Sequence, residues 1–313
     1  MQTDLDSWRL KNKGFMNHFL EISQLSRQQI ESLLQRAVYF KHHNHYPSYA
    51  QYTVANLFYE NSTRTRVSFE LAAKRLSMPV INLDLQSSSE TKGETIEDTI
   101  RTLAAMGIQY FVIRHRQDGL QQSLANQIGD EIHIINAGDG THAHPSQALL
   151  DMMTIIEQKP RLDQLKIAIL GNIRHSRVAN SFQCMCAQLG IGELVLVAPE
   201  LWQPKTVHFG RVTHNLRDGL TDADVVICLR VQHERLLESD HLDLNSYRRD
   251  FALTEESLAY AKPDVMVMHP GPINRGVEID SAVADGANSF ILNQVTNGVF
   301  VRMAIFDAIS NRG

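Results

Sequence analysis

Apolar residues recur along the chain in two patterns, short continuous runs and longer stretches at helical spacing. Residues 25–40 show the helical spacing, and Ser26 with Gln29 three positions later matches the signature of a capping box. A further helix is predicted over residues 144–158, with Pro145 in its first turn. Runs of strand length occupy residues 54–59, 80–85, 110–114 and 132–136, and helical patterns fall between most of them.

The pattern restarts after a polar, proline-bearing break at residues 159–164, KPRLDQ, where we expect a domain linker. Beyond the break, continuous apolar runs occupy residues 165–170, 194–198, 225–229 and 265–268. Such runs, separated by helices, are typical of parallel strands that are buried on both faces. The sequence therefore predicts an α/β protein of two domains, each a parallel sheet flanked by helices, over residues 1–158 and 159–292.

Length and composition fit this organisation. The 313 residues suit domains of about 150 residues, and 43% hydrophobic with 21% charged residues is typical of a soluble protein. A net charge of −5 gives no reason to expect nucleic acid or an anionic membrane. Neither a secretory signal nor an apolar run of about 20 residues is found. Cys184, Cys186 and Cys228 indicate reduced thiols in a cytoplasmic protein, and neither they nor the HAH at 142–144 make a metal-ligand set.

Hydrogen-bond donors gather in FYENSTRTRVSFE, residues 58–70, where a strand gives way to a helix. The apolar residues that follow recur at helical spacing, so the helix is expected to begin close to Thr65. A helix N-terminus presents backbone N–H groups and the positive end of the helix dipole. The side chains of Ser62, Thr63, Arg64 and Thr65 add further donors there, so the cluster favours a phosphate. Helix capping by Ser62 or Thr63, with the arginines merely solvated, is the alternative.

Neither this stretch nor a second segment matches a nucleotide-binding motif. The first lacks the G-x-x-x-x-G-K-[ST] pattern of a P-loop. The segment AILGNIRHSRVANS, residues 168–181, has a strand, Gly171 and a helix, but bulky residues replace the second and third glycines of a dinucleotide fingerprint. Without those glycines the backbone cannot approach a pyrophosphate closely, so support for a dinucleotide site is weak and no cofactor is expected.

Several blocks of the sequence together carry a family resemblance. STRTR at 62–66 resembles the carbamoyl-phosphate-binding motif of the carbamoyltransferases. Six further blocks are similar, in the same order, to those of the aspartate carbamoyltransferase catalytic chains: SSSETKGETIEDT (87–99), RH (114–115), HPSQALLD (144–151), GNIRHSRVA (171–179), LRVQHER (229–235) and MHPGPINRGVEI (268–279). The resemblance covers nearly the whole chain.

The resemblance implies a fold, a reaction and an assembly. The first domain would bind carbamoyl phosphate and the second L-aspartate, with the last helix, within residues 293–311, packed back on the first domain. The carbamoyl group would pass to the amine of L-aspartate, giving N-carbamoyl-L-aspartate and phosphate, an early step of pyrimidine biosynthesis. The family forms trimers with active sites at subunit interfaces. Whether regulatory chains or a dihydroorotase also bind is left open.

The resemblance also implies roles for individual residues on the donor side. Thr65, Arg114 and His144 would be catalytic, as donors to the carbonyl oxygen that becomes an oxyanion, and Gln147 would hold the carbamoyl amide. The full set implied to bind carbamoyl phosphate is Ser62, Thr63, Arg64, Thr65, Arg114, His144, Gln147, Gly271 and Pro272, the last two through their backbone.

On the acceptor side, the residues implied to bind aspartate are Lys92, Arg177, Arg230 and Gln232. A planar guanidinium suits a carboxylate better than an ammonium does. Ser88 and Lys92 would come from the neighbouring subunit, and the choice among Ser87, Ser88 and Ser89 stays open. Asn172 stands where the family often has aspartate, for which we expect a local adjustment.

Two other functions are weighed against this one. Ornithine carbamoyltransferases share the phosphate motif but carry a cysteine in HCLP, where this chain has HPGP, and an ornithine ammonium would meet two arginines. A non-catalytic regulator built on the same scaffold is the other alternative. The presence of every expected donor counts against that regulator.

Overall fold

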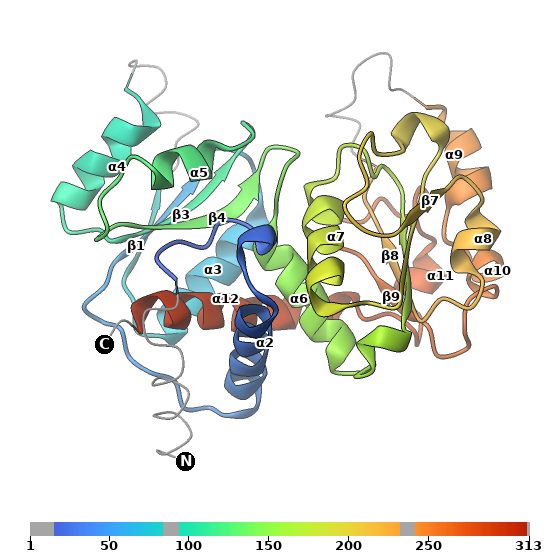
Figure 1. Cartoon of the computed structure of the whole chain (residues 1–313), viewed down its shortest axis with the longest axis horizontal. Helices are drawn as coiled ribbons and strands as arrows, with labels where there is room; N and C mark the ends of the chain where they lie inside the picture. Colours follow the sequence, from blue (N-terminus) through green and yellow to red (C-terminus); the bar gives the residue numbers. More distant parts are fainter. Residues whose placement is uncertain (1–15, 84–93, 232–241, 312–313) are drawn as a thin grey trace. The chain divides into compact units, whose positions relative to one another are not determined.

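Parallel sheets form the framework of the computed structural model, which describes residues 16–83, 94–231 and 242–311 (Figure 1). The chain divides into two units. Unit 1 comprises Met1–Leu149 with Asn297–Gly313, and unit 2 comprises Leu150–Thr296. In each unit helices flank a parallel sheet, as the sequence predicts.

The sheet of unit 1 consists of four strands in the described residues, in the order β2-β1-β3-β4, and all neighbours are parallel. Their bounds are β1 Val54–Phe58, β2 Val80–Leu83, β3 Tyr110–His115 and β4 His133–Asp139. Each coincides with one of the predicted apolar runs. Every residue of β1 and β4 is buried, because helices cover both faces of the sheet.

Two layers of helices enclose this sheet. The helices are η1 Ile22–Gln24, α2 Arg27–His42, α3 Thr63–Arg75, α4 Ile96–Ala105, α5 Leu120–Ala125, α6 Pro145–Ile156 and α12 Ile291–Ser310, of which α6 and α12 continue into unit 2. Apolar residues of α4 and α5 pack with Leu57 and Ile113 on one face, and α3 and α12 lie on the other (Figure 1).

The predicted capping box of α2 is confirmed, since the Ser26 side chain accepts from the Gln29 amide and the Gln29 side chain from the Ser26 amide.

A buried ion pair fastens the last turns of α12 to α2. The Arg36 guanidinium donates to both carboxylate oxygens of Asp307, at 2.8 and 3.2 Å, and the Tyr49 hydroxyl donates to the same carboxylate at 2.6 Å. Arg36 is 3% exposed and Asp307 fully buried, so each charge depends on its partner. This bidentate geometry fixes how the helix C-terminus packs within unit 1.

In the described residues, the sheet of unit 2 has the order β7-β6-β5-β8-β9, again parallel throughout. Its strands are β5 Lys166–Leu170, β6 Glu193–Val197, β7 Arg211–Thr213, β8 Val225–Cys228 and β9 Met266–Met268. The flanking helices are η3 Leu162–Gln164, α7 Arg177–Leu189, η4 Glu200–Trp202, α8 Leu216–Leu220, α9 Leu244–Phe251, α10 Glu255–Leu258 and α11 Ser281–Ala284. In the part of the chain that the structure describes, no helix combines the length and apolar character needed to cross a bilayer.

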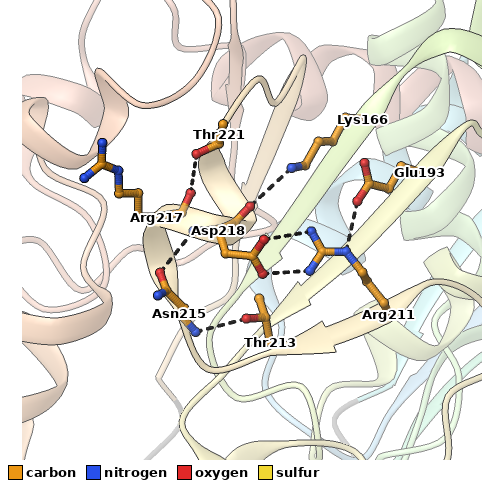
Figure 2. Close-up of polar contacts among 8 residues, drawn as sticks. All are labelled: Lys166, Glu193, Arg211, Thr213, Asn215, Arg217, Asp218 and Thr221. Atoms are coloured by element: carbon orange, nitrogen blue, oxygen red, sulfur yellow. Dashed lines mark hydrogen bonds and ion pairs between the residues drawn. The ribbon is translucent and has the colours of Figure 1, made fainter.

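The edge strand β7 is not predicted by the apolar pattern, because it is short and partly exposed. Ionic contacts hold it instead (Figure 2). The Arg211 guanidinium donates to Asp218 at 2.7 and 3.1 Å and to Glu193 at 3.0 Å. The Asp218 amide donates in turn to the Asn215 side chain, which caps α8. Charged side chains on an edge strand also discourage pairing with another chain.

The carboxyl end of β4 carries a buried acid. Asp139 is 2% exposed and accepts a hydrogen bond from the Gly119 amide at 2.8 Å. Burial raises the pKa of the Asp139 carboxyl from 3.8 to about 6; the Gly119 bond and the nearby His142 oppose this rise, while Asp118 and Glu21 add to it. His142 Nε2 lies 2.8 Å from a carboxylate oxygen of Glu21, and this contact raises the pKa of His142.

This shifted pKa predicts a pH-dependent contribution to stability. Between about pH 4 and pH 6 the unfolded chain has released the Asp139 proton while the folded chain retains it, so stability falls as the pH rises. Asp139→Asn removes this loss while keeping an acceptor for Gly119. The free energy of unfolding of the variant, relative to wild type, should rise by up to about 3 kcal/mol between pH 4 and pH 7 in denaturant titrations.

Asp218→Asn provides a control, because the pKa of Asp218 is shifted in the opposite direction to that of Asp139. The Arg211 hydrogen bond holds the pKa of Asp218 below its ordinary 3.8, so the stability that this carboxylate adds is lost only below about pH 4. The difference between this variant and wild type should therefore stay constant from pH 5 to pH 7. A constant difference for Asp139→Asn across pH 4–7 would contradict the prediction.

Candidate functional site

The strand order of each sheet reverses once among the described strands. In unit 1 the chain runs from β1 outward to β2, then returns to the other side of β1 for β3 and β4. In unit 2 it runs from β5 to β6 and β7, then returns beside β5 for β8 and β9. Open parallel sheets bind ligands outside the carboxyl ends of the strands at such a reversal. Ligand-binding residues are therefore expected in the loops that follow β1 and β3 in unit 1, and in those that follow β5 and β8 in unit 2.

The N-terminus of α3 follows β1 in unit 1. Ser62 is its N-cap residue, but the Ser62 side chain makes no capping hydrogen bond, which counts against the capping interpretation of this serine. Thr63 and Arg64 are exposed in the first turn, and Thr65 is 7% exposed. The Thr65 carbonyl accepts a hydrogen bond from the Ser68 hydroxyl at 3.0 Å. Hydroxyl, guanidinium and backbone N–H donors thus share one helix end.

Arg114 lies near the carboxyl end of β3, beside the loop that leads into α3. Its register partner in β1 is Phe58, and the Tyr59 amide donates to the Arg114 carbonyl at 2.9 Å. The guanidinium donates to the Ala137 carbonyl at 3.2 Å, and its Nε lies 3.4 Å from a carboxylate oxygen of Glu60. The Arg114 side chain is 12% exposed, so it is not completely closed off from solvent.

His144 and Gln147 follow the next strand, β4. His144 immediately precedes α6, and its carbonyl accepts from the Gln147 amide at 3.1 Å. The two residues are 5% and 7% exposed. Since β4 pairs with β3, the structure brings the loops that carry these two residues, Arg114 and the α3 N-terminus to the same edge of one sheet. A helix dipole, amide donors and an arginine at one sheet edge form an arrangement suited to an anion such as phosphate.

In unit 2, Arg177 is the first residue of α7, which follows β5 at the reversal. The Ser176 side chain caps this helix by accepting from the Ala179 amide at 3.2 Å. Arg177 is only 4% exposed, so its guanidinium stands in a place where water screens its charge poorly. A carboxylate that reaches it would form a strong, charge-assisted contact.

Arg230 follows β8. This strand lies beside β5, and Cys228 at its end is the register partner of Leu170 at the end of β5. Gly171 at the end of β5 has φ +124, and a Cβ there would lie 3.1 Å from the Leu229 carbonyl oxygen. Glycine therefore lets the loop that leads to Arg177 approach the loop that carries Arg230. Both arginines thus follow adjacent strands at the reversal in unit 2.

Asn172, which follows Gly171, makes a local turn. It is 4% exposed, and its side-chain oxygen accepts from the His175 amide at 3.3 Å and lies 3.0 Å from His175 Nδ1. A carboxylate could accept the same two contacts, so asparagine keeps the turn without the charge.

Gly271 and Pro272 follow β9, which pairs with β8. The Gly271 amide donates to His269 Nδ1 at 2.8 Å, and Gly271 has φ +71, a backbone conformation that favours glycine. Two features here were not found from the sequence, the Glu60 contact of Arg114 and the buried pair of His269 with Glu278. Both join segments by contacts that no local spacing reveals.

Five of the sequence-derived candidates lie outside the described residues: Ser87, Ser88, Ser89, Lys92 and Gln232. Within residues 16–83, 94–231 and 242–311, no three histidine, cysteine, aspartate or glutamate side chains are arranged to hold a metal ion.

Comparison with known proteins identifies the family. The model of the aspartate/ornithine carbamoyltransferase carbamoyl-P binding domain matches residues 17–157, and that of the Asp/Orn binding domain matches residues 163–309. Aspartate carbamoyltransferase catalytic subunits from the Corby and Paris strains of Legionella pneumophila are each 76% identical over 294 residues, covering 94% of this chain and 99% of theirs.

Solved structures agree with the family models. Aspartate transcarbamoylase from Trypanosoma cruzi, in complex with carbamoyl phosphate and aspartate, has a TM-score of 0.86 at 30% identity, over 96% of this chain and 98% of that one. Ornithine carbamoyltransferase from Pyrococcus furiosus has a TM-score of 0.82 at 26% identity, over 93% and 96%. The chain therefore belongs to the aspartate/ornithine carbamoyltransferase family.

Proposed function

We propose that the protein transfers the carbamoyl group of carbamoyl phosphate to the amine of L-aspartate, giving N-carbamoyl-L-aspartate and phosphate. The observation that carries this proposal is the placement of Arg177 and Arg230 after adjacent strands at the reversal in unit 2. Two guanidinium groups match an acceptor with two carboxylates. The names of the 76% identical relatives and the ligands of the Trypanosoma cruzi enzyme support the same reaction.

The donor would bind at the α3 N-terminus of unit 1. Its phosphate would accept hydrogen bonds from Ser62, Thr63, Arg64 and Thr65, with Arg114 approaching from β3. Charge-assisted hydrogen bonds contribute about 1.5–3 kcal/mol each, so several of them give ample affinity. Because Glu60 lies 3.4 Å from the Arg114 guanidinium, the phosphate would compete with that carboxylate for the arginine.

The transfer itself needs a stabilised oxyanion and a proton acceptor. The aspartate amine attacks the carbonyl carbon, a C–N bond forms, and the negative charge develops on the carbonyl oxygen. Thr65, Arg114 and His144 would donate to that oxygen, and losing one such donor typically lowers turnover by about 10²–10³-fold. Collapse of the intermediate breaks the C–O bond to phosphate, which leaves with its bonding electrons and takes the proton that the amine sheds. Gln147 would hold the carbamoyl amide, and Gly271 and Pro272 would contribute backbone atoms.

The acceptor would bind in unit 2 through Arg177, Arg230 and Gln232. Domain roles follow, with residues 1–158 and the helix near 293–311 assigned to carbamoyl phosphate, and residues 159–292 to aspartate. The family models, which describe a carbamoyl-P and an Asp/Orn binding domain over similar ranges, support this assignment.

A cytoplasmic homotrimer with shared active sites is the assembly we propose. Exposed apolar residues on α3 and on the edge strand β2 support an interface with a second copy: Val67 is 43%, Leu71 44% and Ile81 41% exposed. Val67 and Leu71 stand at i and i+4, on one helix face. The segment that follows β2 carries Ser88 and Lys92, which would complete a neighbour's site.

The proposed reaction is tested by incubating the protein with carbamoyl phosphate and either aspartate or ornithine, followed by a colour test for ureido product. We expect product with aspartate and none with ornithine, because two arginines would repel the ornithine ammonium. Product with ornithine alone would establish the other acceptor class. No product with either amino acid would favour a non-catalytic regulator.

The acceptor clamp predicts a selective loss in Arg230→Ala. Removing one charge-assisted contact should raise the KM for aspartate about 10–100-fold, with carbamoyl phosphate binding near normal in calorimetry. Arg249→Ala is the matched control, since this arginine is exposed and pairs with Asp250. An aspartate saturation curve of Arg230→Ala that overlays wild type would rule out the clamp.

Shared sites predict that two inactive variants complement each other. Arg64→Ala and Lys92→Ala should each be nearly inactive alone, whereas subunits mixed by reversible denaturation should regain activity, because some sites then combine intact Arg64 with intact Lys92. A mixture of Arg64→Ala with Thr65→Val is the control, since both changes affect the same half-site. Sites confined to one subunit would give no recovery in either mixture.

A further inference from the structure

A buried polar network lies behind the acceptor loops of unit 2. His269, immediately after β9, is 2% exposed and Glu278 is 1% exposed. His269 Nε2 lies 3.1 Å from Glu278 Oε1, and the same oxygen accepts from the Asn274 amide at 2.6 Å. On the other side of the ring, the Gly271 amide donates to His269 Nδ1 at 2.8 Å. The network thus joins the two ends of the loop between residues 269 and 278.

These contacts define the protonation of the imidazole. A backbone N–H can only donate, so His269 Nδ1 must be the unprotonated acceptor, and Nε2–H donates to Glu278. The His269 amide also donates to the Gln294 side chain at 2.9 Å, and Gln294 in turn donates to Asp151 at 2.7 Å. The ring is therefore fixed in position, orientation and tautomer.

The same network reaches the loop that carries Arg230. The Asn274 side-chain amide donates to the Val231 carbonyl at 3.0 Å, and Val231 is fully buried beside Arg230 in sequence. Glu278 Oε1 fixes the Asn274 backbone, and Asn274 fixes Val231. One carboxylate oxygen consequently holds both the Gly271 loop and the Arg230 loop.

The stability of the folded chain does not explain why a carboxylate is buried at position 278. Glu278 Oε2 is buried and makes no hydrogen bond with the described residues. A buried carboxylate with one oxygen unsatisfied is costly, and an apolar residue of similar size is often as stable or more so. A residue whose burial is costly but whose contacts converge on two substrate loops fits a role in positioning.

We propose that Glu278 and His269 are positioning residues for the acceptor pocket: they hold the loop that carries Arg230 in the geometry that accepts a dicarboxylic amino acid. This inference rests on the function proposed above. Neither residue needs to touch the substrate. Their removal leaves both loops in place but lets them sample other geometries, so the acceptor site loses affinity while the phosphate-binding residues of unit 1 do not change.

Three variants test the proposal in the full-length enzyme. Glu278→Leu removes the acceptor of both hydrogen bonds at similar size, and the KM for aspartate should rise about 10–100-fold. In Glu278→Gln the carboxamide oxygen can accept both bonds, so the KM should return close to wild type. Asn274→Ala, which releases only Val231, should raise the KM by a smaller factor. Arg275→Ala is the control within the same loop, since that arginine is exposed and pairs with Asp285.

Phosphate binding and hydrogen exchange separate positioning from a general loss of structure. Calorimetry with inorganic phosphate, which would need only the donors of unit 1, should give the same affinity for all variants, and exchange in peptides spanning 270–276 should speed up in Glu278→Leu but not in Glu278→Gln. The proposal is overturned if the KM for aspartate is unchanged in Glu278→Leu, or if aspartate and inorganic phosphate both bind more weakly in parallel with a loss of stability.

Failure of the proposed function gives a different result. If the wild-type protein forms no carbamoylaspartate, the proposed function and the acceptor role are both overturned. Hydrogen exchange still shows, independently of activity, whether Glu278 anchors the loop of residues 270–276. Unchanged exchange in Glu278→Leu overturns the anchoring of the loops whatever the activity. Should Glu278→Leu fail to fold, Asn274→Ala and Glu278→Gln decide the question.

Discussion

The reversal of strand order within each parallel sheet is the constraint on which the site depends. Crossover connections are right-handed, so helices on the two sides of a reversal lie on opposite faces of the sheet, and the loops that leave the neighbouring carboxyl ends diverge. In unit 1 the reversal separates β1 from β3, which lead to the α3 N-terminus and carry Arg114. In unit 2 it separates β5 from β8, which lead to Arg177 and Arg230. Cationic groups therefore stand where each sheet leaves room for a ligand.

The cationic side chains at these positions are held in place by contacts within their own units. Arg114 is oriented by the Ala137 carbonyl and shares its charge with Glu60, while Arg177 is almost fully buried at a capped helix end. Donors that are oriented before the ligand arrives need little reorganisation during reaction, and limited access of water strengthens each contact with an anion. Burying and orienting these arginines costs free energy, which packing and helix capping within each unit offset.

Local signals in the sequence account for much of the fold and for only part of the site. Continuous apolar runs locate the long strands, and Ser26 with Gln29 locates the start of α2, because both depend on neighbours in sequence. The order of the strands and the short strand β7 escape such reasoning, since β7 is held by Arg211 through contacts between segments. The cluster of hydrogen-bond donors at the α3 N-terminus is visible from its residues, whereas Arg114, Arg177 and Arg230 are single arginines that only the family resemblance singled out. The pair of His269 with Glu278 has no local signal at all.

The choice of acceptor cannot reside in the fold, because solved structures of both the aspartate and the ornithine enzymes share it. The donor half is common to the family, so discrimination must come from side chains of unit 2. There the chain places Arg177 and Arg230 after adjacent strands at the sheet reversal and has no cysteine in HPGP, and the buried Glu278 carboxylate joins the HPGP loop to the loop that carries Arg230. In the acceptor site proposed above, two guanidinium groups would favour two carboxylates, and they would disfavour an ammonium, which repels them and cannot accept their hydrogen bonds. In that site the sign of the charge would exclude ornithine, and the position of the held Arg230 loop would select among the acids.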